Sequence, residues 1–464
     1  MQFKIQLHVV TEDGKTQQTE EIAVFDKSHE QLAELGLTIG EAKTLLAQLQ
    51  HQIVAQQTTA YVEDHRNCKD CGKSLRRKGS YPIQFRTLFG TTTLKSPRLY
   101  QCSCQPSAAT TISPLKTLLS EHTAPELLYL ETKWAALMAY GLTAELLKDV
   151  LPVDATLNAE TIRQHLKTVV QRDEAELGEE QCMYVDSCPA EWEALPRPDG
   201  PITVGIDGGY VRDWENEQTN FEVIVGKSLP RDAPDKYFGF VQSYDTKPKR
   251  RLFEVLKGQG LQNNQQITFL SDGGDTVREL QLYLNPHSDH LLDWFHVTMR
   301  ITVLGQYIKG LKHHNPVEGK NMEETLERSK WYLWHGNLYE ALLNIKDLEW
   351  DAEVLESTYP NLRKLHKALV EFHDYIENNR GFIPNYGERW RYGERISTGF
   401  VESTVNAVVS KRFAKKQQMQ WSKQSAHDLL QARVRVLNDE LRAKFEQWYP
   451  GFGGPESEEL KLAA

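Results

Sequence analysis

The sequence predicts a mixed α/β protein assembled from several parts, and three patterns lead to this prediction. Short apolar stretches followed by acidic residues lie in the middle of the chain, as expected for buried strands of a sheet. Amphipathic helical stretches occupy other segments, and two close pairs of cysteines enclose a stretch with hairpin character. At 464 residues, 40% hydrophobic and 25% charged, the chain can form about three cores.

Residues 1–63 predict a hairpin followed by an amphipathic helix. Polar and apolar residues alternate on both sides of Asp13-Gly14, a dipeptide that favours a tight turn. Thr38 and Glu41 have the spacing of a capping box, which predicts a helix over 38–62. The first residues lack the features of a secretory signal.

Residues 64–116 predict a zinc ribbon, which is a β-hairpin with a pair of cysteines at each end. Strands are expected over 82–89 and 91–94, joined at Gly90. Four thiolates complete a tetrahedral shell around Zn²⁺ and leave no open position, so the ion would be structural. Four unliganded thiols in a small β unit are the alternative. The predicted ligands are Cys68, Cys71, Cys102 and Cys104.

Residues 117–172 predict three helices in a helix-turn-helix-like arrangement. The first is expected to run from Pro125 to Tyr140 and to stop at Gly141, and Asn158 is expected to cap the third. A helix-turn-helix would place this third helix in the major groove of DNA, whereas a plain three-helix bundle would leave its polar side in solvent. The side chains expected to contact DNA are Arg163, Gln164 and Lys167.

The acidic segment 173–200 predicts a linker. It contains Cys182 and Cys188, whose spacing matches no usual metal site and which receive no role.

From 201 to 296 the pattern changes to strands with helices between them, in the order β-β-β-α-β-α-β. This is the order of the ribonuclease H fold, in which the first and fourth strands are neighbours. Strands are expected at 202–206, 221–225, 237–244, 267–270 and 290–292.

Three acids fall where this fold would bring them together. Asp207 and Asp272 each follow a predicted strand and precede Gly-Gly, and Glu402 lies on a predicted helix with Asn406 on the same face. Such carboxylates can hold two Mg²⁺ ions, with Mn²⁺ able to substitute, and two ions support phosphoryl transfer. The bases after Glu402 are expected to bind DNA: Lys411, Arg412, Lys415 and Lys416.

The 130 residues between Asp272 and Glu402 are too many for one strand and a loop. Residues 297–395 therefore predict an inserted helical domain, and residues 396–450 predict the final helices of the core, followed by a tail over 451–464. Aromatic side chains are expected in the core of the insertion: Trp331, Tyr332, Trp334, Trp350 and Tyr359.

The net charge of −10 argues at first against a DNA partner, but the charges are unevenly distributed. Residues 64–116 carry ten bases and two acids, whereas residues 171–200 carry nine acids and two bases. The acidic average therefore excludes a uniformly basic surface and leaves a DNA partner open. No apolar run reaches the ~20 residues of a membrane helix, so we expect a cytoplasmic protein, associated with the nucleoid when on DNA.

Four stretches carry a family resemblance: residues 35–43, the ribbon from Cys68 to Cys104 with its segment 85–90, residues 399–403 and residues 411–422. Together they resemble bacterial insertion-sequence transposases of the ISKra type, in the Asp-Asp-Glu class, and more distantly Mutator-like transposases. The resemblance implies cleavage of DNA at terminal inverted repeats and strand transfer into target DNA by a homo-oligomer. It implies metal binding by Asp207, Asp272 and Glu402, and it points to Asp293-x-x-His296 near the active site.

Two other functions remain open at this point. A ribonuclease H-like nuclease would cut without joining, and an inactive regulator derived from a transposase would only bind DNA. The three acids favour an enzyme over the regulator.

Overall fold

The computed structural model describes residues 1–10, 16–104, 110–178, 196, 200–216, 219–262, 264–274, 279–280, 284, 288–413 and 420–453, without the side chains of Thr16, Gln17 and Glu402. The chain is mixed α/β and divides into two compact units. One comprises Met1–Gln171 with the chain from Asp439 onward, and the other comprises Arg172–Asn438. Within the described residues, no helix has the length and apolar character to cross a bilayer.

The first unit begins with a hairpin and a long helix, as predicted. Strands β1 (Gln2–Val10) and β2 (Thr16–Asp26) pair antiparallel, and helix α1 (Ile39–Asp64) contacts β2. Thr38 and Glu41 form the predicted capping box. A short 3₁₀ turn, η1 (Leu32–Glu34), precedes the helix.

The cysteine segment forms the predicted hairpin, with longer strands. Strand β3 (Arg77–Thr87) pairs with β4 (Gly90–Tyr100), and β4 pairs with the short β5 (Thr111–Ile112). Gly90 has φ +114°, which a residue without Cβ adopts readily. Helix α2 (Pro114–Leu118) follows, and the core beneath the sheet comprises Val54, Ile83, Leu94, Leu115 and Leu119.

Three further helices follow, with boundaries that differ from the prediction. They are α3 (Pro125–Ala135), α4 (Tyr140–Val150) and α5 (Ala159–Leu177). The first ends before Tyr140 because Ala139 is extended, with ψ 144°, and Gly141 lies in the first turn of α4. Asn158 caps α5 as predicted, since its Oδ1 accepts from the backbone N–H of Glu160 and Thr161.

The end of the described chain belongs to the first unit. Helix α17 (Leu441–Trp448) contacts α3, where the rings of Phe445 and Phe452 meet that of Tyr129 at centroid distances of 5.5 and 5.3 Å.

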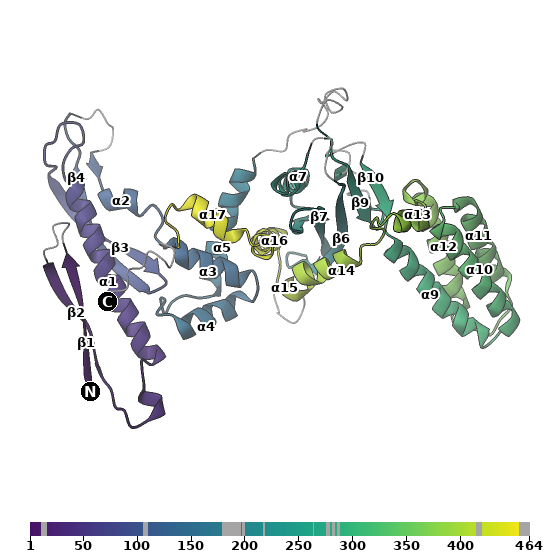
Figure 1. Ribbon diagram of the computed structural model, residues 1–464, viewed down its shortest axis with the longest axis horizontal. Helices are drawn as coiled ribbons and strands as arrows, with labels where there is room; N and C mark the ends of the chain where they lie inside the picture. Colours follow the sequence, from purple (N-terminus) through teal and green to yellow (C-terminus); the bar gives the residue numbers. More distant parts are fainter. Residues whose placement is uncertain are drawn as a thin grey trace. The chain divides into compact units, whose positions relative to one another are not determined.

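The second unit contains a five-stranded sheet (Figure 1). Its spatial order is β10-β9-β6-β7-β8. Strands β6 and β7 are antiparallel, as are β7 and β8, whereas β9 runs parallel to both β6 and β10. The first and fourth strands of the unit are therefore neighbours, as predicted. The bounds are β6 (Ile202–Arg212), β7 (Asn220–Leu229), β8 (Lys236–Val241), β9 (Ile267–Ser271) and β10 (Asp289–Leu292).

Helices cover both faces of this sheet. On one face, Leu252 and Leu256 of α7 (Pro248–Gly258) pack with Ile206, Phe238 and Phe240. The helices of the other face, with the short turns between them, are α14 (Gly399–Val405), the π-helical turn η3 (Asn406–Ser410), α15 (Lys411–Phe413) and α16 (Lys423–Leu437).

The first strand of the sheet is longer than predicted. It was expected to end at Ile206, but β6 continues through Asp207, because Gly208 and Gly209 pair with Ile224 and Val223 of β7. The glycines are part of the ladder and do not end the strand.

Two glycines on β6 allow α14 to lie directly on the strand. A methyl group at Gly205 would come within 2.3 Å of Val401 Cγ2, and one at Gly209 would come within 3.3 Å of Val409 Cγ1. Residues 205, 207 and 209 point to the same face of the sheet. The side chain of Asp207 therefore faces the surface that α14 covers.

Residues 294–391 are mainly helical. Four long helices pack against one another (Figure 1): α9 (Trp294–Lys312), α10 (Pro316–Trp334), α11 (Leu338–Val354) and α12 (Leu362–Asn378). The turn η2 (Arg380–Phe382) and helix α13 (Tyr386–Arg391) follow.

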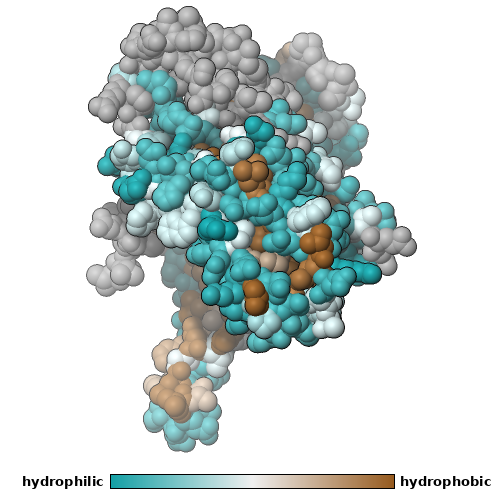
Figure 2. Space-filling view, turned by 90° about the vertical axis from the view of Figure 1, so that its right-hand side faces the viewer, coloured by the Kyte–Doolittle hydropathy of each residue, from teal (hydrophilic) through white to brown (hydrophobic). Residues whose placement is uncertain are grey.

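The aromatic residues expected in this helical core are only partly there. Tyr359 is buried, and Tyr332 and Trp334 pack against the core. Trp331 and Trp350 are 56% and 63% exposed, so the prediction is wrong for both. The buried residues Met322, Leu326, Ser329 and Leu333 define the inner side of α10 and leave Trp331 outside. The face seen in Figure 2 is mainly hydrophilic, with separate apolar patches.

We expect Gly205→Ala to lower the free energy of unfolding of the second unit by about 1–3 kcal/mol, because the added methyl overlaps Val401 and Phe400. Urea denaturation measures the change. Gly399→Ala is the matched control in α14 itself, since nothing lies within 4 Å of a methyl group there. Equal effects of both substitutions would contradict this account of the close packing.

Candidate functional site

The four cysteines of the ribbon converge on one point. The Sγ atoms of Cys68 and Cys104 are 3.4 Å apart, as are those of Cys71 and Cys102, and all four lie within 4.8 Å of one another. A tetrahedral ion with bonds of about 2.3 Å requires sulfurs about 3.8 Å apart. The thiols are therefore close enough to bind a metal ion, which is consistent with structural zinc.

The turn between the first two cysteines is held by backbone hydrogen bonds. The N–H of Cys68 donates to Lys73 O at 2.8 Å, and that of Gly72 donates to Cys68 O at 2.9 Å. Gly72 has φ +71°, so the turn uses the conformational freedom of glycine.

The crowded thiols alter each other's ionisation. The backbone N–H of Cys104, and then the thiols of Cys104 and Cys71, lower the pKa of Cys102 to about 7. The thiols of Cys102, Cys68 and Cys71, in that order, raise the pKa of Cys104. Deprotonation of Cys102 is thus favoured and deprotonation of Cys104 is disfavoured. A full set of four thiolates therefore needs a cation among them.

Asp207 lies on β6, and Asp272 directly follows the neighbouring strand β9. Gly205 of β6 is paired with Leu270 of β9 in the parallel ladder, so two residues further Asp207 and Asp272 are at the same level. Gly208 N–H donates to Asp207 Oδ1 at 2.7 Å, and Gly274 N–H to Asp272 Oδ1 at 3.3 Å.

The environment of Asp207 disfavours its charged form. Burial raises its pKa most, and the carboxylates of Asp272 and Asp293 raise it further, while Gly208 N–H and His296 act in the opposite direction. These electrostatic couplings place Asp207, Asp272, Asp293 and His296 in one neighbourhood.

Asp293 is a fully buried carboxylate that joins three segments. Its Oδ1 accepts from Phe295 N–H at 2.8 Å, which caps α9, and from Thr398 N–H at 2.9 Å. Its Oδ2 accepts from the Thr398 hydroxyl and bonds to Nδ1 of His296, the latter at 2.9 Å. Asp293 N–H donates to Ser271 O at 2.8 Å. The residue is a helix cap and also a junction.

His296 is largely buried beside these acids. The hydrogen bond from its ring to Asp293 raises its pKa most, and Asp207 and Asp272 raise it further, while burial opposes the shift. The imidazolium therefore places a positive charge among the carboxylates.

Glu402 lies on α14, the helix that rests on β6 over the side of Asp207. Its side chain is outside the description. Asn406 is exposed and is the first residue of the π-helical turn η3. The prediction that Asn406 shares a face with Glu402 assumes regular α-helical spacing, and this spacing ends at Val405.

The residues expected to bind DNA are differently placed. Arg163 and Gln164 both donate to Glu160, at distances between 2.6 and 2.8 Å, and Lys167 is half-buried on the same helix. Lys411 is exposed.

The prediction for Arg412 needs correction. Arg412 is fully buried, with its guanidinium carbon 5.5 Å from the ring centre of Trp421, so it forms part of the core and not of a DNA-binding surface. Lys415 and Lys416 lie outside the described residues, as do Cys182 and Cys188.

The sequence offered no signal for several residues around the acids. Glu222 of β7 lies over Gly208, where a methyl group would come within 2.4 Å of its Oε1, and burial and Asp272 raise its pKa. Tyr375 of α12 is packed under Arg300, whose guanidinium carbon is 4.1 Å from the ring centre. Burial raises the pKa of Tyr375, and Asp272 raises it further. For Glu222, the Gly-Gly after Asp207 is the sequence feature that could have indicated a side chain close to the strand.

Among the described residues, the four cysteines are the one group of three or more potential ligands that meets within 4.8 Å. The acids around Asp207 do not form such a group among the described residues, to which the side chain of Glu402 does not belong. Compared with models of known protein families and with curated proteins, the chain matches none.

We expect purified protein to carry about one zinc ion per chain, since four thiolates fill the shell of the ion. Cys71→Ser should lose most of it, because three thiolates leave an open position, whereas Cys188→Ser should retain it. Atomic emission measures the metal. Full zinc in Cys71→Ser would contradict the assignment of the ligands.

A second prediction concerns His296. Because its folded-state pKa is raised above the ordinary 6.5, the bond of the imidazolium to Asp293 stabilises the fold fully below pH 6.5, and this stabilisation is lost as pH rises through the folded pKa. We expect wild type to exceed His296→Gln by about 1–3 kcal/mol in unfolding free energy at pH 6, and by less at pH 9. Urea denaturation over this range tests it. A difference that stays constant with pH would count against the ion pair.

Proposed function

We propose that this chain is a metal-dependent DNA transposase of the Asp-Asp-Glu class, which cleaves DNA at the ends of a mobile element and joins those ends to target DNA. One observation carries the proposal. Asp207 lies on β6, Asp272 directly follows the adjacent parallel strand β9, and the helix of Glu402 lies across the face to which Asp207 points.

The arrangement of the strands supports a ribonuclease H-like core. Three antiparallel strands, β6 to β8, are followed by two parallel ones, and β6 lies in the centre between β7 and β9. In such a core the acids of the first and fourth strands are neighbours, which agrees with the register of Asp207 and Asp272. The helices after β10 would then be an insertion before the last acid.

The donor set suits Mg²⁺, which prefers carboxylate oxygens. Asp207, Asp272 and Glu402 would hold two ions, whose chemistry is to activate the attacking oxygen and to stabilise the leaving one. The raised pKa of Asp207, caused by burial and by neighbouring carboxylates, supports this fit, because a cation offsets both effects.

The surrounding residues would keep these acids in place. Asp293 fixes Thr398 immediately before α14, so it holds the helix of Glu402 against β6. Because Asp207 and Asp272 raise the pKa of His296, the protonated ring would in turn lessen the repulsion between these carboxylates.

The reaction would proceed in two displacements at phosphorus. Water attacks a phosphodiester at the element end, the bond to the 3′ oxygen breaks, and that oxygen leaves as a free 3′-hydroxyl. The 3′-hydroxyl then attacks a phosphodiester of the target DNA, forming one P–O bond as another breaks. No protein nucleophile is needed.

The remaining parts would bind DNA. The zinc ribbon and the helices α3 to α5 in a helix-turn-helix role would contact the terminal inverted repeats, and a homo-oligomer would bring two ends together. The basic character of residues 64–116 supports this assignment.

We expect Asp207→Asn to reduce Mg²⁺-dependent cleavage and joining to background, because the amide cannot replace the charge of the carboxylate. The substrates are duplex oligonucleotides that carry the inverted repeats flanking the coding DNA, and the products are separated on denaturing gels. Asp232→Asn, in the exposed loop between β7 and β8, is the matched control and should retain activity.

The same assay distinguishes the alternatives. Cleavage without joining would identify a nuclease, and DNA binding without cleavage would identify a regulator. Full activity of Asp207→Asn would refute the assignment of the acids.

A further inference from the structure

Two cavities lie on either side of the short strand β5 in the first unit. Their volumes are about 590 and 560 Å³, and the segment Thr111–Ser113 together with Lys116 lines both. Neither cavity belongs to the acidic site, and Cys68, a ligand of the predicted zinc ion, is one of the residues that line the first.

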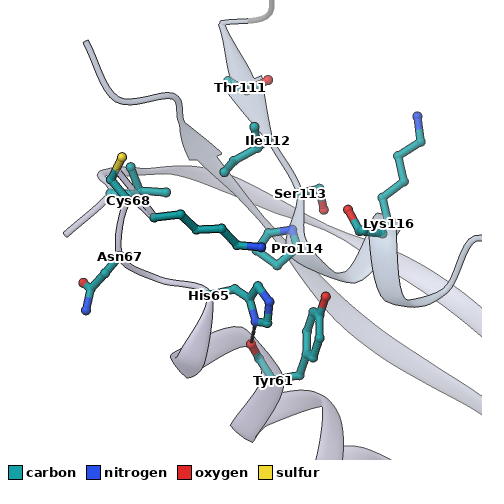
Figure 3. Close-up of a pocket in the computed structure, with 12 residues that line it drawn as sticks. Tyr61, His65, Asn67, Cys68, Thr111, Ile112, Ser113, Pro114 and Lys116 are labelled. Carbon is teal, nitrogen blue, oxygen red and sulfur yellow. Dashed lines mark hydrogen bonds between the residues drawn. The ribbon is translucent and has the colours of Figure 1, made fainter. Parts of the chain in front are cut away.

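The first cavity lies between the end of α1, the cysteine turn and β5. Figure 3 shows Tyr61 of α1 and His65, which directly follows α1, on one side and Ser113 and Pro114 on the other. The rings of Tyr61 and His65 stack at 4.0 Å, and His65 Nδ1 bonds to Tyr61 O at 2.8 Å, which fixes this wall. Lys69, next to Cys68, also lines it. Lys69 thus adds a positive charge to this fixed wall of the first cavity.

The second cavity is lined by hydroxyls and by three basic side chains. Tyr81 donates to Ser113 Oγ at 3.2 Å, and Ser113 Oγ is 2.7 Å from Ser96 Oγ, so the hydroxyls form a chain at its base. The basic side chains are Lys78, Arg98 and Lys116. In Figure 3 the amino group of Lys116 extends away from Tyr61 and His65. The lysine thus lines the first cavity with its stem while its charge points away from that wall.

The two cavities share a positive character. Among the residues that the structure describes, no carboxylate lines either of them, whereas four bases do. The pKa of Tyr81 is lowered, chiefly by hydrogen bonding with Ser113 and Ser96 and also by the charges of Lys116 and Arg98. The field at the base of the second cavity therefore favours a negative group.

We infer that the two cavities form one site for the phosphodiester backbone of duplex DNA, with β5 as the ridge between them. This inference rests on the proposed function, for which DNA is the substrate. Lysine, arginine, serine and tyrosine are the side chains that commonly contact phosphates, and such contacts position a protein on DNA without reading its sequence. The bases are spread over two adjoining hollows and do not surround one point, which suits successive phosphates of a backbone better than one free phosphate.

The test uses the full chain with Lys78→Gln, Arg98→Gln and Lys116→Gln combined. Lys69 is kept, so the residue next to Cys68 is unchanged. Binding to a fluorescent duplex of arbitrary sequence is measured by anisotropy as a function of salt. We expect affinity to fall at least about tenfold near 0.1 M salt, and the slope of log K against log salt to become shallower by about three, since each lost phosphate contact removes about 0.9.

The matched control removes the same charge elsewhere. Lys309→Gln, Lys346→Gln and Lys364→Gln combined alter three exposed lysines on α9, α11 and α12. Its affinity and slope should stay within a factor of about two of wild type. An equal loss in both triple variants would overturn the inference, because net charge alone would then explain the effect.

Further measurements separate the remaining outcomes. Zinc content equal to that of wild type verifies that the triple variant is folded. If the triple variant is not folded, DNA binding is measured with the single substitution Lys116→Glu, which lies at an exposed position. Unchanged DNA binding in the variants overturns the site but leaves the proposed function intact, whereas a wild type that binds no DNA overturns both. Complete competition by millimolar inorganic phosphate would also overturn the inference, in favour of a site for a single phosphate.

Discussion

The second unit depends on one buried carboxylate. Asp293 accepts hydrogen bonds from the start of α9, from both the backbone and the hydroxyl of Thr398, and from His296, while its own N–H donates to the end of β9. A buried carboxylate is unfavourable unless its oxygens are fully hydrogen-bonded, so these segments are held where they satisfy it. Because Thr398 is one of them, the start of α14 is fixed next to β9.

The close packing on β6 follows from the same constraint. From this starting point α14 and the turn η3 lie over β6, where Gly205 and Gly209 leave space for Val401 and Val409. Between these glycines the one large side chain on the face is Asp207. The glycines thus make room for the helix that covers Asp207. They do not form a turn, because they lie inside the β6–β7 ladder.

Local patterns predicted local features well. The capping box at Thr38, the cap at Asn158, the β3–β4 hairpin and the close approach of the four cysteines all depend on short spacings or on one turn, and all were predicted. Features set by distant segments were missed. The extension of β6 requires β7, the burial of Arg412 requires Trp421, and the place of Tyr375 near Asp272 requires the whole of α12 to fold back. The exposure of Trp331 and Trp350 could not be read from hydrophobicity, because each helix of the bundle buries only one side.

The helices α9 to α13 leave the sheet at Asp293 and return at Thr398, and the two residues are hydrogen-bonded to each other. The whole excursion is therefore a closed loop with its own core. Closing a loop costs entropy that grows only with the logarithm of its length, about 0.6 kcal/mol for each doubling. Helices could be added to or removed from this segment over evolutionary time at small thermodynamic cost, while the hydrogen bond between Asp293 and Thr398 and the acids beside it stay unchanged.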